Sequence, residues 1–280
     1  GVTQEDYSMT GAFLAVGTMS LAAAALSFTS WRFPRTRPVI EGMPTVVVRD
    51  GEVRYLRTYG ETEAGSGQKV DADTLFRIAS LSKGFASSMV GLAVSKGKLS
   101  LSAPVSGFAP ELALPRGGEK SLTLADILSH RTGLPPNAYD NLLEAGLLPE
   151  AILPQYRKVR PTCAVADCYT YQNIPFDLSA RALAAAYDAA FSDLVKERLF
   201  APLGMKTATY GLDGLVGSGN WARPHVRRRA AGAAASAPAW TSIEVKLPYY
   251  TTPAAGGVNA SVRDMAQWLN AQLGNVPDVL

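Results

Sequence analysis

The 280-residue sequence predicts a mixed α/β (α+β) protein. Two β-rich runs near the start of the chain flank a tight-turn signal and predict a hairpin. Segments with apolar residues at helical spacing follow, and the last of them lies close to the end of the chain. A strand pair followed by helices and irregular connections is typical of mixed architectures. The apolar fraction of 47% is sufficient for a sizeable core, so we expect a folded protein.

Residues 1–41 form a distinct N-terminal segment. No charged residue occurs between Asp6 and Arg32, and residues 9–31 are rich in small and apolar side chains. A stretch of this length can span a bilayer, but an Ala-rich helix packed on a sheet has the same composition. The sequence leaves both open, a membrane anchor and a packing helix. The cellular location of the protein stays open, and we favour a periplasmic or membrane-associated location over a cytoplasmic one.

The predicted hairpin joins Thr45–Arg49 to Glu52–Arg57. Asp50-Gly51 separates the two runs, and Asp-Gly is a strong signal for a two-residue turn between strands. A second compact apolar run covers Leu75–Ala79. We expect no further strand before Leu280, so the sequence predicts no partner strand for the hairpin.

Helical spacing begins at Ser80, where Phe85, Met89, Leu92 and Ala93 share one face. Gly97 is the predicted stop of this helix. Residues 211–248 are rich in Gly, Ala and Pro and are expected to be irregular. Further helices are predicted at Thr123–Ser129, Ala138–Leu147, Leu178–Leu199 and Ser261–Leu273.

The composition excludes several functional classes. A net charge of +3 and a charged fraction of 18% argue against a nucleic-acid partner. With two His and two Cys, the chain has few ligands for a zinc site and little room for a Ser-His-Asp triad. We therefore expect neither a metal nor an organic cofactor. Cys163 and Cys168 remain either two thiols or a short disulfide loop.

The sharpest chemical signal is Ser80-Leu-Ser-Lys83, an S-x-x-K pattern at the predicted start of a helix. Residues three apart share a helix face, so the Lys83 amine can reach the Ser80 hydroxyl. A desolvated lysine can act as a base near neutral pH and activate such a hydroxyl. S-x-x-K is an acyl-transfer motif of serine β-lactamases and penicillin-binding proteins.

The surrounding sequence resembles the class C β-lactamase-like serine hydrolase superfamily, which includes penicillin-binding protein-like and family VIII carboxylesterase-like members. The resemblance runs from about Met43 to Leu273, and the order and spacing of its signatures match. The segments that carry it are Phe76–Lys83, Leu128–Leu134, Tyr171-Gln-Asn173, Leu199–Met205 and Pro253–Gly257 with Asp264-Met265.

The resemblance implies a β-lactamase/transpeptidase-like fold, with an antiparallel sheet flanked by helices plus a helical domain. Residues 42–98 and 248–280 would form the α/β portion with the nucleophile helix. Residues 99–247 would form the mainly helical portion that carries the Tyr-x-Asn motif.

The same resemblance implies the roles of individual residues. Ser80 would be the acylated nucleophile and Lys83 would shuttle its proton. Tyr171 would be a second base, with a pKa lowered by neighbouring positive charge, and which of the two takes the proton is left open. Asn173, with Gly256 and Gly257, would bind the substrate.

The implied activity is hydrolysis of a small-molecule ester or amide through an acyl-enzyme on Ser80. We favour an esterase, because Tyr-Gln-Asn replaces the Tyr-Ser-Asn common in β-lactamases. A β-lactamase and a D-amino-acid peptidase are the alternatives within the superfamily, and fold does not choose among them.

One part of the superfamily pattern is absent. Its third box, Lys/His-x-Gly on a later strand, does not follow Gly257. We therefore expect the C-terminal strands to be missing and the chain, made alone, to fold poorly and hydrolyse test esters weakly. A truncated or degenerate, inactive homologue is the corresponding alternative to an active enzyme.

Overall fold

The computed structural model describes residues 42–228 and 239–280. The described residues all belong to one compact unit. The segment 9–31, for which the sequence left a membrane anchor and a packing helix open, lies outside the described residues. Within the described ranges, no helix combines the length and apolar character needed to cross a membrane.

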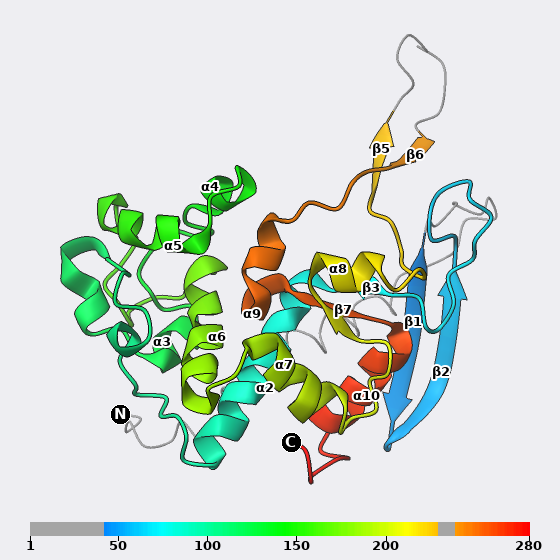
Figure 1. Cartoon of the computed structure of the whole chain (residues 1–280), viewed down its shortest axis with the longest axis horizontal. Helices are drawn as coiled ribbons and strands as arrows, with labels where there is room; N and C mark the ends of the chain where they lie inside the picture. Colours follow the sequence, from blue (N-terminus) through cyan, green and yellow to red (C-terminus); the bar gives the residue numbers. More distant parts are fainter. Residues whose placement is uncertain (1–41, 229–238) are drawn as a thin grey trace. The chain divides into compact units, whose positions relative to one another are not determined.

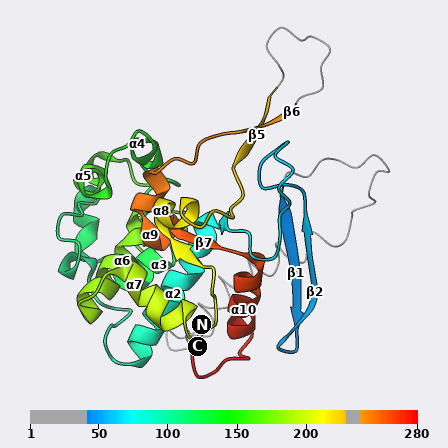
Figure 2. The same cartoon turned by 45° about the vertical axis from the view of Figure 1, so that its right-hand side comes forward.

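The predicted hairpin is present. β1 (Met43–Arg49) and β2 (Glu52–Tyr59) pair antiparallel, and α10 (Val262–Gln272) packs against β1 (Figures 1 and 2). Asp50 and Gly51 both have positive φ, at 53° and 78°, as a turn matched to the twist of the strands requires. In the described part of the chain, β1 and β2 pair only with each other.

The expectation that no further strand occurs before Leu280 is wrong. β3 (Phe76–Arg77), β7 (Val258–Ala260) and β4 (Thr209–Tyr210) form an antiparallel sheet in the order β3-β7-β4. β5 (His225–Arg228) and β6 (Ala239–Ser242) form a separate hairpin. Strands β3, β7 and β4 have only two or three residues each, which is too short for an alternating pattern to show in a sequence.

The five predicted helices correspond in place to helices of the structure, but they differ from them in number and length. The predicted zone Leu178–Leu199 covers two helices. The first, α6 (Ile174–Tyr187), begins earlier and ends where Asp188 takes a left-handed conformation with φ of 51°, and α7 (Phe191–Val195) follows it. Besides these and α10, the α-helices in the described part of the chain are α2 (Ser82–Ser95), α3 (Leu124–Leu128), α4 (Asp140–Glu144), α5 (Pro149–Ile152), α8 (Gly211–Val216) and α9 (Pro253–Gly256).

Two helix starts are fixed by capping boxes. The Thr123 side chain accepts from the Asp126 amide, and the Asp126 carboxylate accepts in return from the Thr123 amide. Ser261 and Asp264 make the same reciprocal pair at the start of α10. Such pairs satisfy amides that otherwise have no partner in the first helical turn, which explains why both predicted starts agree with the structure.

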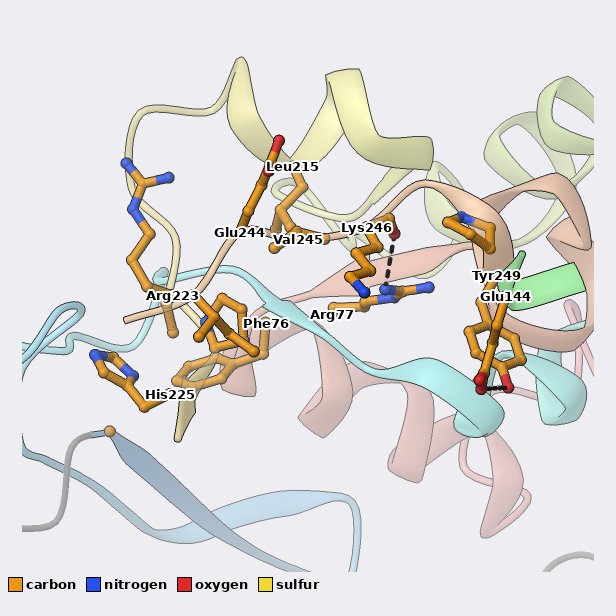
Figure 3. Close-up of a pocket in the computed structure, with 15 residues that line it drawn as sticks. Phe76, Arg77, Glu144, Leu215, Arg223, His225, Glu244, Val245, Lys246 and Tyr249 are labelled. Carbon is orange, nitrogen blue, oxygen red and sulfur yellow. Dashed lines mark hydrogen bonds between the residues drawn. The ribbon is translucent and has the colours of Figure 1, made fainter. Parts of the chain in front are cut away.

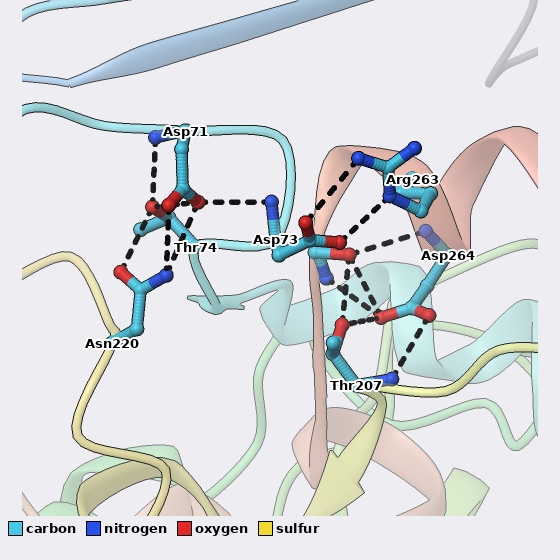
Figure 4. A network of polar contacts seen from close by, with 8 residues as sticks. Asp71, Asp73, Thr74, Thr207, Asn220, Arg263 and Asp264 are labelled. Carbon is cyan, nitrogen blue, oxygen red and sulfur yellow. Dashed lines mark hydrogen bonds and ion pairs between the residues drawn. The ribbon is translucent and has the colours of Figure 1, made fainter.

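A polar network fixes the approach to β3 (Figure 4). The Asp71 carboxylate accepts from the Thr74 hydroxyl at 2.8 Å and from the Asn220 amide at 3.1 Å. Arg263 of α10 donates twice to Asp73, at 2.7 and 3.2 Å. The network therefore links the loop before β3 to α10 and to the segment after α8.

The core joins α2, the helix that follows Ser80, to the rest of the fold. Phe85 of α2 is fully buried, stacks on Trp268 of α10 with ring centroids 4.0 Å apart, and meets Phe200 edge-on at 5.7 Å. α2 also packs against α6 and α9, which brings three segments distant in sequence together. The division into an α/β portion and a helical portion at residues 99–247 stays a prediction.

Replacing Phe85 by Ala should lower the free energy of unfolding by about 3–5 kcal/mol, because it leaves a cavity between α2 and α10. Leu148 is 56% exposed, so the control Leu148→Ala should cost less than about 0.5 kcal/mol. Urea unfolding followed by circular dichroism measures both. Similar losses for the two variants would contradict this packing.

Candidate active site

Ser80 lies in a short 3₁₀ turn, Ala79–Leu81, between β3 and α2. Its side chain is exposed, whereas Lys83, one turn further on, is buried. Ala79 has a φ of 46°, a left-handed conformation that costs a residue with a Cβ about 1–2 kcal/mol. Backbone strain of this kind clusters at functional sites. Here it turns the chain sharply so that the serine faces solvent.

Four of the residues singled out from the sequence come together. The Tyr171 hydroxyl donates to Ser80 Oγ at 2.7 Å, and Lys83 Nζ lies 3.4 Å from the same oxygen. Lys83 Nζ also donates to Asn173 Oδ1 at 2.7 Å and to the Ala255 carbonyl at 3.0 Å. The structure thus brings the S-x-x-K and Tyr-x-Asn segments to one oxygen atom.

The pKa of the Lys83 amine lies far below the ordinary lysine value. Burial lowers its pKa from 10.5 to about 7, and the negative charges of Asp140 and Asp177 oppose part of that fall. A substantial fraction of the amine is therefore neutral near neutral pH.

The hydrogen bonds give the neutral amine a direction. Two N–H groups are taken by the Asn173 and Ala255 oxygens, which can only accept. The lone pair then faces Ser80 Oγ, whose own hydrogen is free because Tyr171 donates to it. This arrangement can pass the serine proton to the lysine nitrogen.

The expected lowering of the Tyr171 pKa is wrong. Burial raises the pKa of this phenol, and its hydrogen bond to Ser80 offsets only part of the rise. The nearest amine, that of Lys83, is itself partly neutral near neutral pH, and the negative charge of Asp140 adds to the rise. Tyr171 therefore keeps its proton at neutral pH and acts on Ser80 as a donor.

Asp140 is a site residue that sequence reasoning missed. Its Oδ2 accepts from Asn173 Nδ2 at 2.6 Å, which orients the Asn173 amide with its oxygen toward Lys83. Burial raises the pKa of the Asp140 carboxyl, while Asn173 and Lys83 lower it. No sequence pattern links Asp140 to the Tyr-x-Asn motif, so only the folded chain reveals the contact.

Asp177 was also missed, although its spacing carried a signal. It follows Asn173 by four residues on α6 and therefore shares its helix face. The half-buried carboxylate accepts from the amides of Ala254 at 2.7 Å and Ala255 at 3.4 Å. Burial raises its pKa to about 7. Asp177 thereby holds α9, whose Ala255 carbonyl binds Lys83.

His130 and Gln172 support the tyrosine without reaching Ser80. The backbone amide of Gln172 donates to His130 Nδ1 at 3.1 Å, and the His130 ring lies 4.6 Å from the Tyr171 ring. Burial lowers the pKa of His130 to about 4, so the ring is neutral. The buried Gln172 side chain donates to the Pro135 carbonyl at 2.7 Å and thus fixes a neighbouring loop.

Gly256 and Gly257 lie at the end of α9, directly after Ala255. A Cβ on Gly257 would lie 2.8 Å from Pro253 Cα and from Tyr210 Cε1, so close packing requires glycine there. The substrate-binding roles implied for both glycines stay predictions.

A cavity of about 660 Å³ runs beside β3, the strand that leads to the turn with Ser80 (Figure 3). Arg77 extends into it, stacks over the Tyr250 ring at 4.2 Å and donates to the Lys246 carbonyl at 3.3 Å. At one end, the Tyr249 hydroxyl donates to Glu144 at 2.6 Å. None of the four converging residues lines this cavity.

In the described ranges, no cluster of three or more His, Cys, Asp or Glu side chains is placed to hold a metal ion.

Comparison with known proteins gives a consistent picture. The chain is 33% identical over 174 residues to the D-alanyl-D-alanine-carboxypeptidase/endopeptidase AmpH of Escherichia coli K12, covering 60% of this chain and 45% of AmpH. It is 37% identical over 95 residues to Esterase EstB of Burkholderia gladioli, covering 33% of this chain and 24% of EstB. The chain spans about half the length of the curated relatives it matches.

The fold matches as well. A class C β-lactamase structure superposes with a TM-score of 0.64 at 22% identity, over 95% of this chain and 65% of that one. The predicted β-lactamase/transpeptidase-like fold is therefore confirmed. A family model described as Beta-lactamase matches residues 34–279, and with most of its length matched the chain belongs to the β-lactamase family.

Proposed function

We propose that this chain is a serine hydrolase that forms a covalent acyl-enzyme on Ser80. The observation that carries the proposal is the position of Ser80 Oγ between the Tyr171 hydroxyl and a lysine amine with a pKa of about 7. A serine hydroxyl becomes nucleophilic when an adjacent base can take its proton. Membership of the β-lactamase family supports the same chemistry.

In the proposed reaction, neutral Lys83 takes the Ser80 proton as Oγ bonds to the carbonyl carbon of the substrate. The bond from that carbon to the leaving group then breaks. Tyr171, protonated and 2.7 Å from Ser80 Oγ, is placed to protonate the departing oxygen. The proton held by Lys83 restores the phenol. In the second half, water gives a proton to Lys83 as its oxygen bonds to the acyl carbon. The bond from that carbon to Ser80 Oγ then breaks, Oγ takes back a proton, and the acid is released.

We propose esters as the substrates. The sequence argument for esters relied on Gln172, but its side chain is buried and contacts the loop at Pro135 rather than Ser80. The similarity to Esterase EstB supports the proposal instead. The longer similarity to AmpH favours a D-peptide carboxypeptidase as the second candidate. An ester and a D-alanyl-D-alanine peptide, offered separately, distinguish the two.

A fluorophosphonate should add its mass to the intact chain, and peptide mapping should place the adduct on Ser80. Ser80→Ala should abolish the adduct because the nucleophilic oxygen is gone, whereas Ser87→Ala on the following helix, α2, should leave it unchanged. A parallel incubation with a penicillin tests the β-lactam alternative. An adduct on any other serine would contradict the assignment.

The rate of this acylation should rise with pH, with a midpoint near the Lys83 pKa of about 7, because only the neutral amine can accept the proton. The titratable groups around the amine are Asp140, Asp177, Tyr171 and His130. The Asp140 charge raises the Lys83 pKa, so Asp140→Asn should move the midpoint to lower pH.

Glu52→Gln is the matched control, since it removes one negative charge from an exposed position on β2. It should leave the midpoint unchanged. A midpoint near the ordinary lysine value, or an upward shift with Asp140→Asn, would contradict lysine as the base.

A further inference from the structure

Cys163 and Cys168 form a disulfide, which settles the alternative that the sequence left open. The bond closes a small loop that ends three residues before Tyr171. Both cysteines are partly exposed, so small solutes can reach them. The mechanism proposed above does not use this bond.

The disulfide loop lies on the segment 130–133. The amides of Thr162, Ala166 and Thr170 donate to the carbonyls of Gly133, Arg131 and His130 at 2.8, 2.9 and 2.9 Å. The approach is so close that a Cβ on Gly133 would lie 2.6 Å from the Cys163 carbonyl oxygen. The loop and this segment therefore move together or separate together.

The same segment positions Tyr171. His130 accepts from the Gln172 amide and lies against the Tyr171 ring. Thr170, the residue before Tyr171, donates to the His130 carbonyl. His130 thus contacts both the end of the disulfide loop and the tyrosine that donates to Ser80.

The loop borders a cavity and contains a strained residue. A second cavity of about 510 Å³ is lined in part by Cys163, Ala164 and Val165 of the loop. Ala166 has a φ of 68°, an unfavourable left-handed conformation for a residue with a Cβ. A loop beside a cavity, with a strained residue inside it, depends on its cross-link more than a well-packed loop does.

We infer that Cys163 and Cys168 are positioning residues whose disulfide holds the Tyr171 hydroxyl on Ser80, so that acylation depends on the thiol–disulfide state of this pair. A dithiol reductant would break the S–S bond and leave two thiols, while its own two thiols become a disulfide. The loop and residues 130–133 would then loosen, and Tyr171 would lose its alignment. The inference rests on the proposed acylation of Ser80.

The chain has only two cysteines, so a reductant acts at this bond alone. The test measures the rate of fluorophosphonate labelling of Ser80 in wild type, Cys163→Ser/Cys168→Ser, Tyr171→Phe and the triple variant. Loss of the disulfide should slow labelling about tenfold or more when Tyr171 is present, because small misplacements of a reacting group are costly. In the Tyr171→Phe background it should change the rate by less than about twofold, because the two changes act through one group.

Reductant should reproduce the effect in wild type, reoxidation should reverse it, and the double-serine variant should not respond. Equal slowing with and without Tyr171, or no slowing in wild type, would overturn the inference.

Hydrogen exchange gives a readout that does not need activity. Reduction should speed exchange in peptides covering residues 162–173 while leaving α10 protected, which also shows that the fold persists. Unchanged exchange at residues 162–173 would overturn the inference. Absence of any Ser80 adduct in the oxidised wild type would instead contradict the proposed function.

Discussion

The arrangement of the candidate site depends on the burial of one amine. Lys83 lies in a part of the core where its charged form is unfavourable, and this is what brings its pKa to about 7. A buried amine still requires hydrogen-bond partners, because an unsatisfied polar group would be costly. The Asn173 and Ala255 oxygens supply them, and they leave the third direction of the nitrogen to Ser80.

Each of those partners is itself held by a carboxylate. Asp140 binds the Asn173 amide, and Asp177 binds the backbone of α9 at Ala254 and Ala255. Both carboxylates also act on Lys83 through their charge. The same two side chains, one on α4 and one on α6, therefore hold the partners of the amine and offset part of the fall in pKa that burial causes. A change at either would alter geometry and charge together.

The sequence predicted the parts of the structure that depend on local chemistry. Asp50-Gly51 specifies its turn through backbone conformations that few residue pairs accept, and the hairpin is present as expected. Ser80 and Lys83 are three residues apart, so their contact follows from helical geometry. The match of Tyr171 and Asn173 to the superfamily pattern indicated that they join the same site, and the structure places them there.

What the sequence could not predict depends on tertiary packing. Asp140 meets Asn173 only because the fold brings the start of α4 close to the start of α6. The predicted direction of the Tyr171 pKa was wrong because burial, which a sequence does not show, raises it, and the charge of Asp140 raises it further. Strands as short as β3 and β4 exist only because β7 lies between them. The most direct test of this account is the pKa of Lys83 itself, measured by NMR titration of the chain with ¹³C-labelled lysine and assigned with Lys83→Arg. The account predicts a titration near pH 7, and a Lys83 signal that titrates near the ordinary lysine value of about 10.4 would contradict it.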